Sequence, residues 1–83
     1  MKLLYFAWVR QKTGKSEETL PLPPGSRTVG DLIAWLAARG GGYAEAFSDP
    51  ARLRAAKNQE HVNLVCAIAD GDEIAFFPPV TGG

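Results

Sequence analysis

The sequence predicts an α+β domain in which one main helix packs across one face of a mixed sheet of four to five strands. A length of 83 residues permits one domain. Apolar residues make up 46% of the chain and charged residues 22%, which is typical of a folded globular protein. Runs of strand-like residues near both ends flank a single amphipathic stretch, and one such helix is buried economically against a sheet.

The first two expected elements are strands. Residues 2–10 are rich in aromatic and branched side chains, which favour a strand. Gly14 lies in a turn sequence, and residues 16–22 read as a second strand that ends in a proline-rich stretch. Together the two runs predict a hairpin.

The main helix is expected over residues 29–39. Thr28 is suited to cap it, and Asp31 follows three residues later as in a capping box. Gly40 then stands where a helix commonly stops. The helical spacing forms one apolar stripe from Val29, Leu32, Ile33 and Leu36.

The second half of the chain contains shorter elements. They are a helical turn at 43–47 and three strands at 53–58, 61–64 and 73–77, with a turn at 70–72 before the last strand. Pro78 and Pro79 stop the last strand because proline cannot donate to a ladder. The complete order of elements resembles the β-grasp (ubiquitin-like) fold.

The face of the sheet opposite the helix is expected to be apolar. On the first strand Leu4, Phe6 and Trp8 share a face whose ends are charged. On the last strand Ala75 and Phe77 share the face opposite Phe76. An uncovered apolar face on a small domain commonly marks a partner surface. The alternative is that residues 40–49 fold back over this face.

Composition excludes several classes of partner. Nine Lys and Arg balance nine Asp and Glu, so no electrostatic attraction to nucleic acid or to an anionic membrane is expected. The apolar N-terminal run is too short to span a membrane. Cys66 is the single cysteine, which prevents an internal disulfide and fits a reducing compartment. The cytoplasm is the expected location.

No motif in the body of the chain predicts catalysis or a metal site. Gly14-Lys15-Ser16 lacks the leading glycine of a phosphate-binding loop, and the acidic turn at 70–73 lacks EF-hand spacing. Cys66 and His61 have no third group that would orient them as nucleophile and base. We therefore expect no bound metal and no bound cofactor.

The end of the chain has an unusual composition. After a domain at 1–77, residues 78–83 form an expected flexible tail that begins with two prolines and ends in Gly-Gly. Its last part, Val80, Thr81, Gly82 and Gly83, is thin enough to enter a narrow channel because glycine lacks a Cβ. Once activated, for example as an acyl-adenylate, the Gly83 carboxylate could accept sulfur or an amine. A frayed end is the alternative.

The segment DGDEIAFFPPVTGG, residues 70–83, closely resembles the C-terminal signature of the MoaD-like sulfur carriers, the family of molybdopterin synthase small subunits. The segments LLYFAWVR, TVGDLIAWL and AAKNQEHV are also similar to that family, so the resemblance covers essentially the whole chain. Gly-Gly alone is less specific, since ubiquitin-like proteins and thiamine sulfur carriers share it.

The resemblance implies a defined chemistry at Gly83. A ubiquitin-activating-type adenylyltransferase would use ATP to adenylate its carboxylate, and a sulfurtransferase system would convert it to a thiocarboxylate. The tail would enter the large subunit of a heterotetrameric molybdopterin synthase and donate sulfur to cyclic pyranopterin monophosphate. The catalytic side chains would belong to these partners, so the chain alone would not be an enzyme.

The resemblance also implies an interface that uses Phe6 and Phe77, to which Leu4 and Trp8 would add. A third apolar contact of the family falls at His61, where this sequence departs from the pattern. Either the patch stops short of His61 or its histidine makes the interface pH-sensitive. Alternative functions remain open: a ubiquitin-like protein modifier, a sulfur carrier for thiamine or tRNA thiolation, or a plain interaction module.

Overall fold

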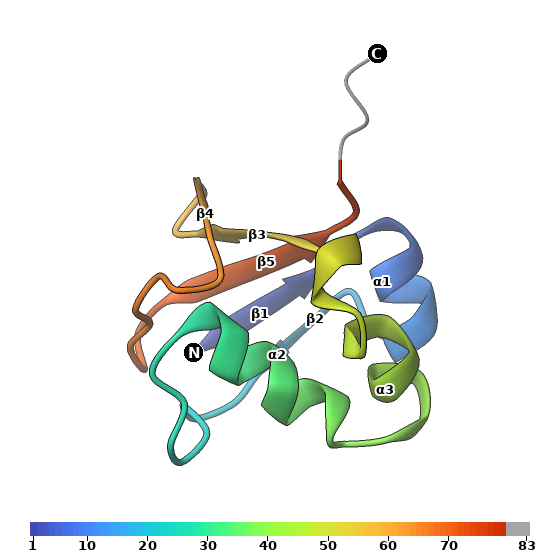
Figure 1. Ribbon diagram of the computed structural model, residues 1–83, viewed down its shortest axis with the longest axis horizontal. Coiled ribbons are helices and arrows are strands. Elements are labelled where there is room, and N and C mark those ends of the chain that lie inside the picture. Colours follow the sequence, from blue (N-terminus) through green and yellow to red (C-terminus); the bar gives the residue numbers. More distant parts are fainter. Residues whose placement is uncertain (80–83) are drawn as a thin grey trace.

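The computed structural model describes residues 1–79, so the expected tail residues Val80, Thr81, Gly82 and Gly83 lie outside the described residues. The strands are β1 (Lys2–Tyr5), β2 (Glu17–Thr19), β3 (Arg54–Lys57), β4 (Glu60–Val62) and β5 (Glu73–Phe77). The helices are α1 (Ala7–Thr13), α2 (Val29–Ala37), α3 (Gly41–Phe47) and the 3-10 helix η1 (Pro50–Arg52). The expected α+β, β-grasp arrangement is confirmed (Figure 1).

The sheet has five strands in the order β2-β1-β5-β3-β4. β1 runs parallel to β5 at its centre, and the remaining neighbours are antiparallel. The sheet is mixed because the first and last strands, β1 and β5, are parallel neighbours at its centre. The last strand therefore occupies the middle of the sheet and leaves it at one end (Figure 1).

Helix α2 forms where the sequence predicts it. The Thr28 side chain accepts from the Asp31 backbone, and the Asp31 carboxylate accepts from the Thr28 backbone, which completes the capping box. The helix ends at Ala37, two residues before the expected end. Its whole apolar stripe is buried: Val29, Leu32, Ile33 and Leu36.

The expectation of one strand over residues 2–10 is wrong. β1 ends at Tyr5, and Ala7 adopts a positive φ of 54° that turns the chain into α1. Helix α1 ends at Gly14, which lies in the left-handed region with a φ of 78°. The chain leaves the sheet after Tyr5, and α1 places Val9 among the buried core side chains. The first two strands are thus antiparallel neighbours, as expected, but α1 connects them.

Helix α3 contradicts the alternative in which residues 40–49 cover the open face. It packs against α1 and α2 on the helical side of the sheet. Phe47 meets the buried Phe76 edge-to-face at 5.0 Å between ring centroids and lies 6.0 Å from Tyr5. Such contacts add stability beyond the area they bury. Residues 1–79 therefore place no helix on the opposite face.

The shorter strands start or end earlier than the residue patterns predict. β2 has three residues where seven were expected, and β4 covers 60–62 where 61–64 was expected. Asn58 and Gln59 both adopt positive φ angles in the two-residue turn between β3 and β4. β5 matches its expected bounds.

Edge strand β2 is attached to the helical layer through Glu18. This carboxylate accepts hydrogen bonds from four side chains: Tyr5 at 2.7 Å, Arg39 at 2.7 Å, Tyr43 at 3.1 Å and Lys15 at 3.1 Å. Partial burial acts to raise the pKa of Glu18, but the four hydrogen bonds outweigh it and lower the pKa to about 2. The ionised carboxylate thus links β2 to Tyr5 on β1, to Tyr43 on α3, and to Lys15 and Arg39 in the connecting segments.

Candidate partner-binding surface

The uncovered face of the sheet carries a row of small and apolar side chains. Strand register places Leu4 beside Ala75, Ala75 beside Ala56, and Ala56 beside His61. Because alternate residues of a strand point to one face, these four share the face opposite the helices. Their neighbours Leu3, Ile74 and Ala55 are buried on the helical face.

A second row lies toward the end of β5. Phe77 follows Ala75 on the same face, and its ring centroid lies 5.2 Å from that of His61. The backbone N–H of Phe6 donates to the Phe76 carbonyl at 3.1 Å, which places Phe6 next to Phe77 beyond the last residue of β1. Phe6 is 49% exposed. We call this surface the open-face patch; it consists of Leu4, Phe6, Ala75, Phe77 and His61.

Trp8 does not lie on the strands that carry this patch. Its expected position on the first strand is wrong because residue 8 lies in α1. There its ring packs partly against the core and carries the Arg52 guanidinium 4.9 Å from its centroid. Strand register thus brings Leu4, Phe77 and His61 onto one face with Phe6 beside them, and Trp8 lies on α1 next to Arg52.

Charged side chains border the open-face patch on this face of the sheet. Lys2 forms an ion pair with Glu17 at 3.2 Å near the opposite end of β1 from Phe6. Arg54 lies beside Phe77 in the sheet register. A polar rim around an apolar centre is typical of a protein–protein interface.

The chain leaves the sheet next to the open-face patch. Phe76 is fully buried and Phe77 half-buried, so the two phenylalanines face opposite sides of β5 as the alternation predicts. Pro78 and Pro79 follow directly and end the ladder. The chain leaves the sheet at this end of β5 (Figure 1). A partner that covers the patch would therefore also lie close to the residues that follow.

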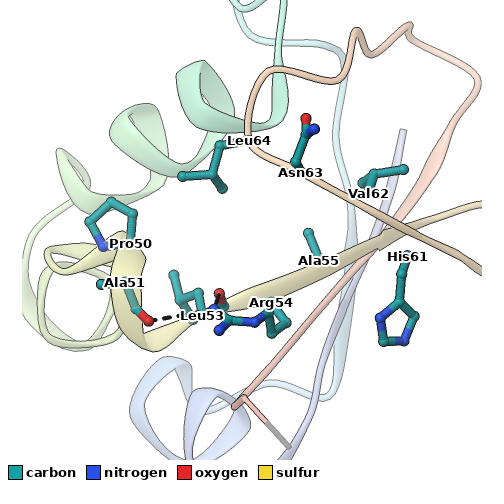
Figure 2. Close-up of a pocket in the computed structure, with 9 residues that line it drawn as sticks. All are labelled: Pro50, Ala51, Leu53, Arg54, Ala55, His61, Val62, Asn63 and Leu64. Atoms are coloured by element: carbon teal, nitrogen blue, oxygen red, sulfur yellow. Dashed lines mark hydrogen bonds between the residues drawn. The ribbon is translucent and has the colours of Figure 1, made fainter.

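A pocket of about 580 Å³ opens at the edge of the sheet beside the patch. It lies between η1, the start of β3, and the segment from β4 to Leu64. Figure 2 shows Leu64 on one side of this space and Leu53 and Ala55 on the other. Arg54 and His61 also border it. Sequence reasoning missed this pocket, because it depends on where β3 and β4 separate.

Nothing in residues 1–79 forms a metal centre: no group of three or more His, Cys, Asp or Glu side chains lies close enough together. The Cys66 sulfur makes a weak contact of 3.6 Å with the Ala67 carbonyl. In the same part of the chain, every helix is too short or too polar to span a bilayer.

Helices on one face of a small mixed sheet, with an apolar opposite face at the end of the central strand, define a ubiquitin-like (β-grasp) protein. Residues 3–83 match the model of the ThiS family, and the chain belongs to this family.

Relatives make the family assignment more specific. The molybdopterin synthase sulfur carrier subunit of Escherichia coli (strain K12) is 42% identical, and the alignment covers 100% of this chain and 99% of the relative. The subunit of the same name from Haemophilus influenzae is 37% identical over 100% of this chain and 99% of its own length. In structure, small archaeal modifier protein 1 of Haloferax volcanii is similar, with a TM-score of 0.66, 25% identity, and 96% and 97% of the two chains covered.

Proposed function

We propose that this chain is the sulfur carrier subunit of a molybdopterin synthase. The observation that carries the proposal is the open-face patch, which lies at the end of the central strand from which Pro78 departs. A partner docked on Phe77 would be held next to the proposed tail. Full-length similarity to two proteins named molybdopterin synthase sulfur carrier subunit supports the same function.

The proposed reactive group is the Gly83 carboxylate, which lies outside the described residues. An adenylyltransferase joins this carboxylate to the α-phosphate of ATP and releases pyrophosphate. Hydrosulfide supplied by a sulfurtransferase system then attacks the acyl carbon and displaces AMP, and loss of its proton leaves a thiocarboxylate. Gly82, Thr81 and Val80 form the arm that carries it into a partner, since a chain without bulky side chains fits a narrow channel. Sulfur finally passes to cyclic pyranopterin monophosphate.

The proposed partners supply the remaining machinery. A molybdopterin synthase large subunit covers the open-face patch, and two copies of each chain form a heterotetramer. The activating enzyme docks on the same face, because both partners require access to Gly83. We place this chemistry in the cytoplasm, where ATP is available and Cys66 stays reduced. ATP serves the activating enzyme, and the chain itself holds no cofactor.

A second candidate function is protein modification through an isopeptide bond from Gly83 to a lysine. The structural likeness to a small archaeal modifier protein favours it. A sulfur carrier for thiamine or tRNA thiolation would use the same thiocarboxylate. These functions differ in the molecule that receives sulfur or the acyl group from the activated Gly83. Identifying the product of the reaction therefore distinguishes them.

Reconstitution tests the proposal. The chain is treated with the adenylyltransferase, ATP and a sulfur source, then mixed with the large subunit and cyclic pyranopterin monophosphate. We expect molybdopterin to form, and we expect none from a variant with one alanine appended after Gly83, although that variant remains folded. Equal product from the extended variant would overturn the role of the Gly83 carboxylate.

A further inference from the structure

The pocket beside β4 exists because β3 and β4 separate at one end. Their last paired residues are Ala55 and Val62. Beyond them the Leu64 carbonyl accepts from the Gly30 backbone at 2.8 Å, which draws that segment toward the start of α2. On the other strand, the preceding residues turn away through η1. A space therefore opens where the next pair of the ladder would form.

Side chains from both faces of these strands border the pocket. Leu53, Ala55 and Val62 belong to the helical face, whereas Arg54 and His61 belong to the open face. Leu64, 37% exposed, lies across from them (Figure 2). Pockets of about 300–1,000 Å³ that are mostly apolar with a few polar groups are typical binding sites. The size and lining fit an apolar side chain with its adjoining backbone.

Within residues 1–79, Arg54 at this pocket has no acidic partner. The Arg54 guanidinium donates to the carbonyls of Leu53 and Ala51, at 2.9 and 3.5 Å, and forms no ion pair with a carboxylate of residues 1–79. No acidic residue borders the pocket. At the opposite edge of the sheet, Glu18 pairs with both Arg39 and Lys15. The Arg54 guanidinium is thus available to pair with a carboxylate of a partner, which makes this edge of the sheet complementary to an acidic segment.

The pocket is continuous with the open-face patch. His61 borders the pocket, and its ring also contacts that of Phe77 at 5.2 Å between centroids. A partner seated on the patch can therefore reach the pocket past His61.

We propose that this pocket anchors a segment of the large subunit that carries an apolar side chain next to a carboxylate. The apolar side chain packs against Leu53 and Leu64, and the carboxylate pairs with Arg54. This inference rests on the proposed function, which supplies the partner, and it adds a second contact to the open-face patch.

The apolar contact is tested with two neighbouring substitutions in the full chain. Leu64→Asp places a charge in the pocket. Val65→Asp places the same charge one residue away, at a side chain that is 78% exposed and does not border the pocket. Binding to the large subunit from the same organism is measured by calorimetry. We expect Leu64→Asp to weaken affinity at least tenfold and Val65→Asp less than twofold. Equal affinities of the two variants would overturn the pocket contact.

The ionic contact is tested with Arg54→Gln and its control Lys57→Gln, which removes a charge from the same strand outside the pocket. We expect Arg54→Gln to weaken binding about threefold to tenfold and to reduce the dependence of affinity on salt. An unchanged salt dependence would contradict a carboxylate at Arg54.

Two controls separate failure of this inference from failure of the proposed function. Circular dichroism and thermal unfolding establish that each variant is folded. If the wild-type chain does not bind the large subunit, the proposed function fails. If the wild type binds and Phe77→Asp does not, while Leu64→Asp and Arg54→Gln bind normally, only the pocket inference fails.

Discussion

The rings of His61 and Phe77 are in contact although a third strand, β3, lies between the strands that carry them. His61 lies on β4 and Phe77 on β5, and these strands flank β3 without pairing with each other. Contact is possible because Ala56, between them on β3, projects only a methyl group onto this face. The pair joins an edge strand to the central strand that leads to the end of the chain.

Phe77→Asp is expected to weaken binding of the large subunit at least tenfold, equivalent to about 1.4 kcal/mol or more. An ionised carboxylate at this position would have to lose its hydration on complex formation, and the apolar contact of the Phe77 ring would be lost. Thr19→Asp is the matched control, because Thr19 lies opposite Lys2 at the far end of the same face. Calorimetry should show near wild-type affinity for the control. Unimpaired binding of Phe77→Asp would refute the location of the interface.

A fixed positive charge at position 61 is expected to weaken the same complex. His61→Arg would keep a cation on the patch and require its desolvation on docking, whereas His61→Gln stays neutral at a similar polarity. We expect a loss of about threefold to tenfold for the arginine variant and less than twofold for glutamine. If both variants bind as wild type, His61 lies outside the interface and the patch ends at Phe77.

Glu18→Gln is expected to lower the free energy of unfolding by about 1–2 kcal/mol at neutral pH, since the amide cannot accept the same charged hydrogen bonds. Glu17→Gln serves as the control, because Glu17 makes only an exposed ion pair with Lys2. Urea unfolding of both variants measures the difference. Equal stability of the two variants would contradict a structural role of the Glu18 cluster.

The same cluster predicts a pH dependence of stability. The pKa of Glu18 in the folded chain is lowered to about 2, below the value of about 4.3 for an unperturbed glutamate. Its stabilisation is therefore fully present above that unperturbed value and is lost as pH falls toward 2. Unfolding experiments between these pH values should show a smaller loss of stability in Glu18→Gln than in wild type. Parallel curves would argue against an ionised, hydrogen-bonded Glu18.

Gly42→Ala is expected to destabilise the fold by about 1–3 kcal/mol. A Cβ at Gly42 would lie 1.7 Å from the Lys12 carbonyl oxygen, so α1 and α3 would have to separate. Gly71→Ala is the control, because a Cβ there meets no atom within 4 Å. Gly42→Ala should lower the midpoint temperature of thermal unfolding, and Gly71→Ala should leave it nearly unchanged. A neutral Gly42→Ala would contradict the close packing of these two helices.

Local signals predicted the elements whose ends are marked by their own residues. Thr28 and Asp31 fixed the start of α2 through the capping box, and the prolines fixed the end of β5. The alternation of Phe76 and Phe77 indicated which ring is buried. In each case the interaction that decides the structure lies within a few residues along the chain.

Long-range packing decided what local signals could not. Residues 7–10 were predicted as part of the first strand, yet they lie in α1, where Val9 packs into the core, so tertiary packing overrides their β propensity. The position of Trp8 was wrong for this reason. Likewise, the pairing of Ala56 with His61 and the separation of β3 from β4 depend on register, which the sequence of one strand does not specify.

The most direct test of the proposed sulfur carrier function is the intact mass of the chain after incubation with its activating enzyme, ATP and a sulfur donor, in the presence of cell proteins. We predict a mass gain equal to replacement of one oxygen by sulfur, located at Gly83 by fragmentation, with no conjugates to other proteins. Conjugates without the thiocarboxylate would establish a protein modifier. An unchanged mass under conditions in which the enzyme is active would contradict both functions.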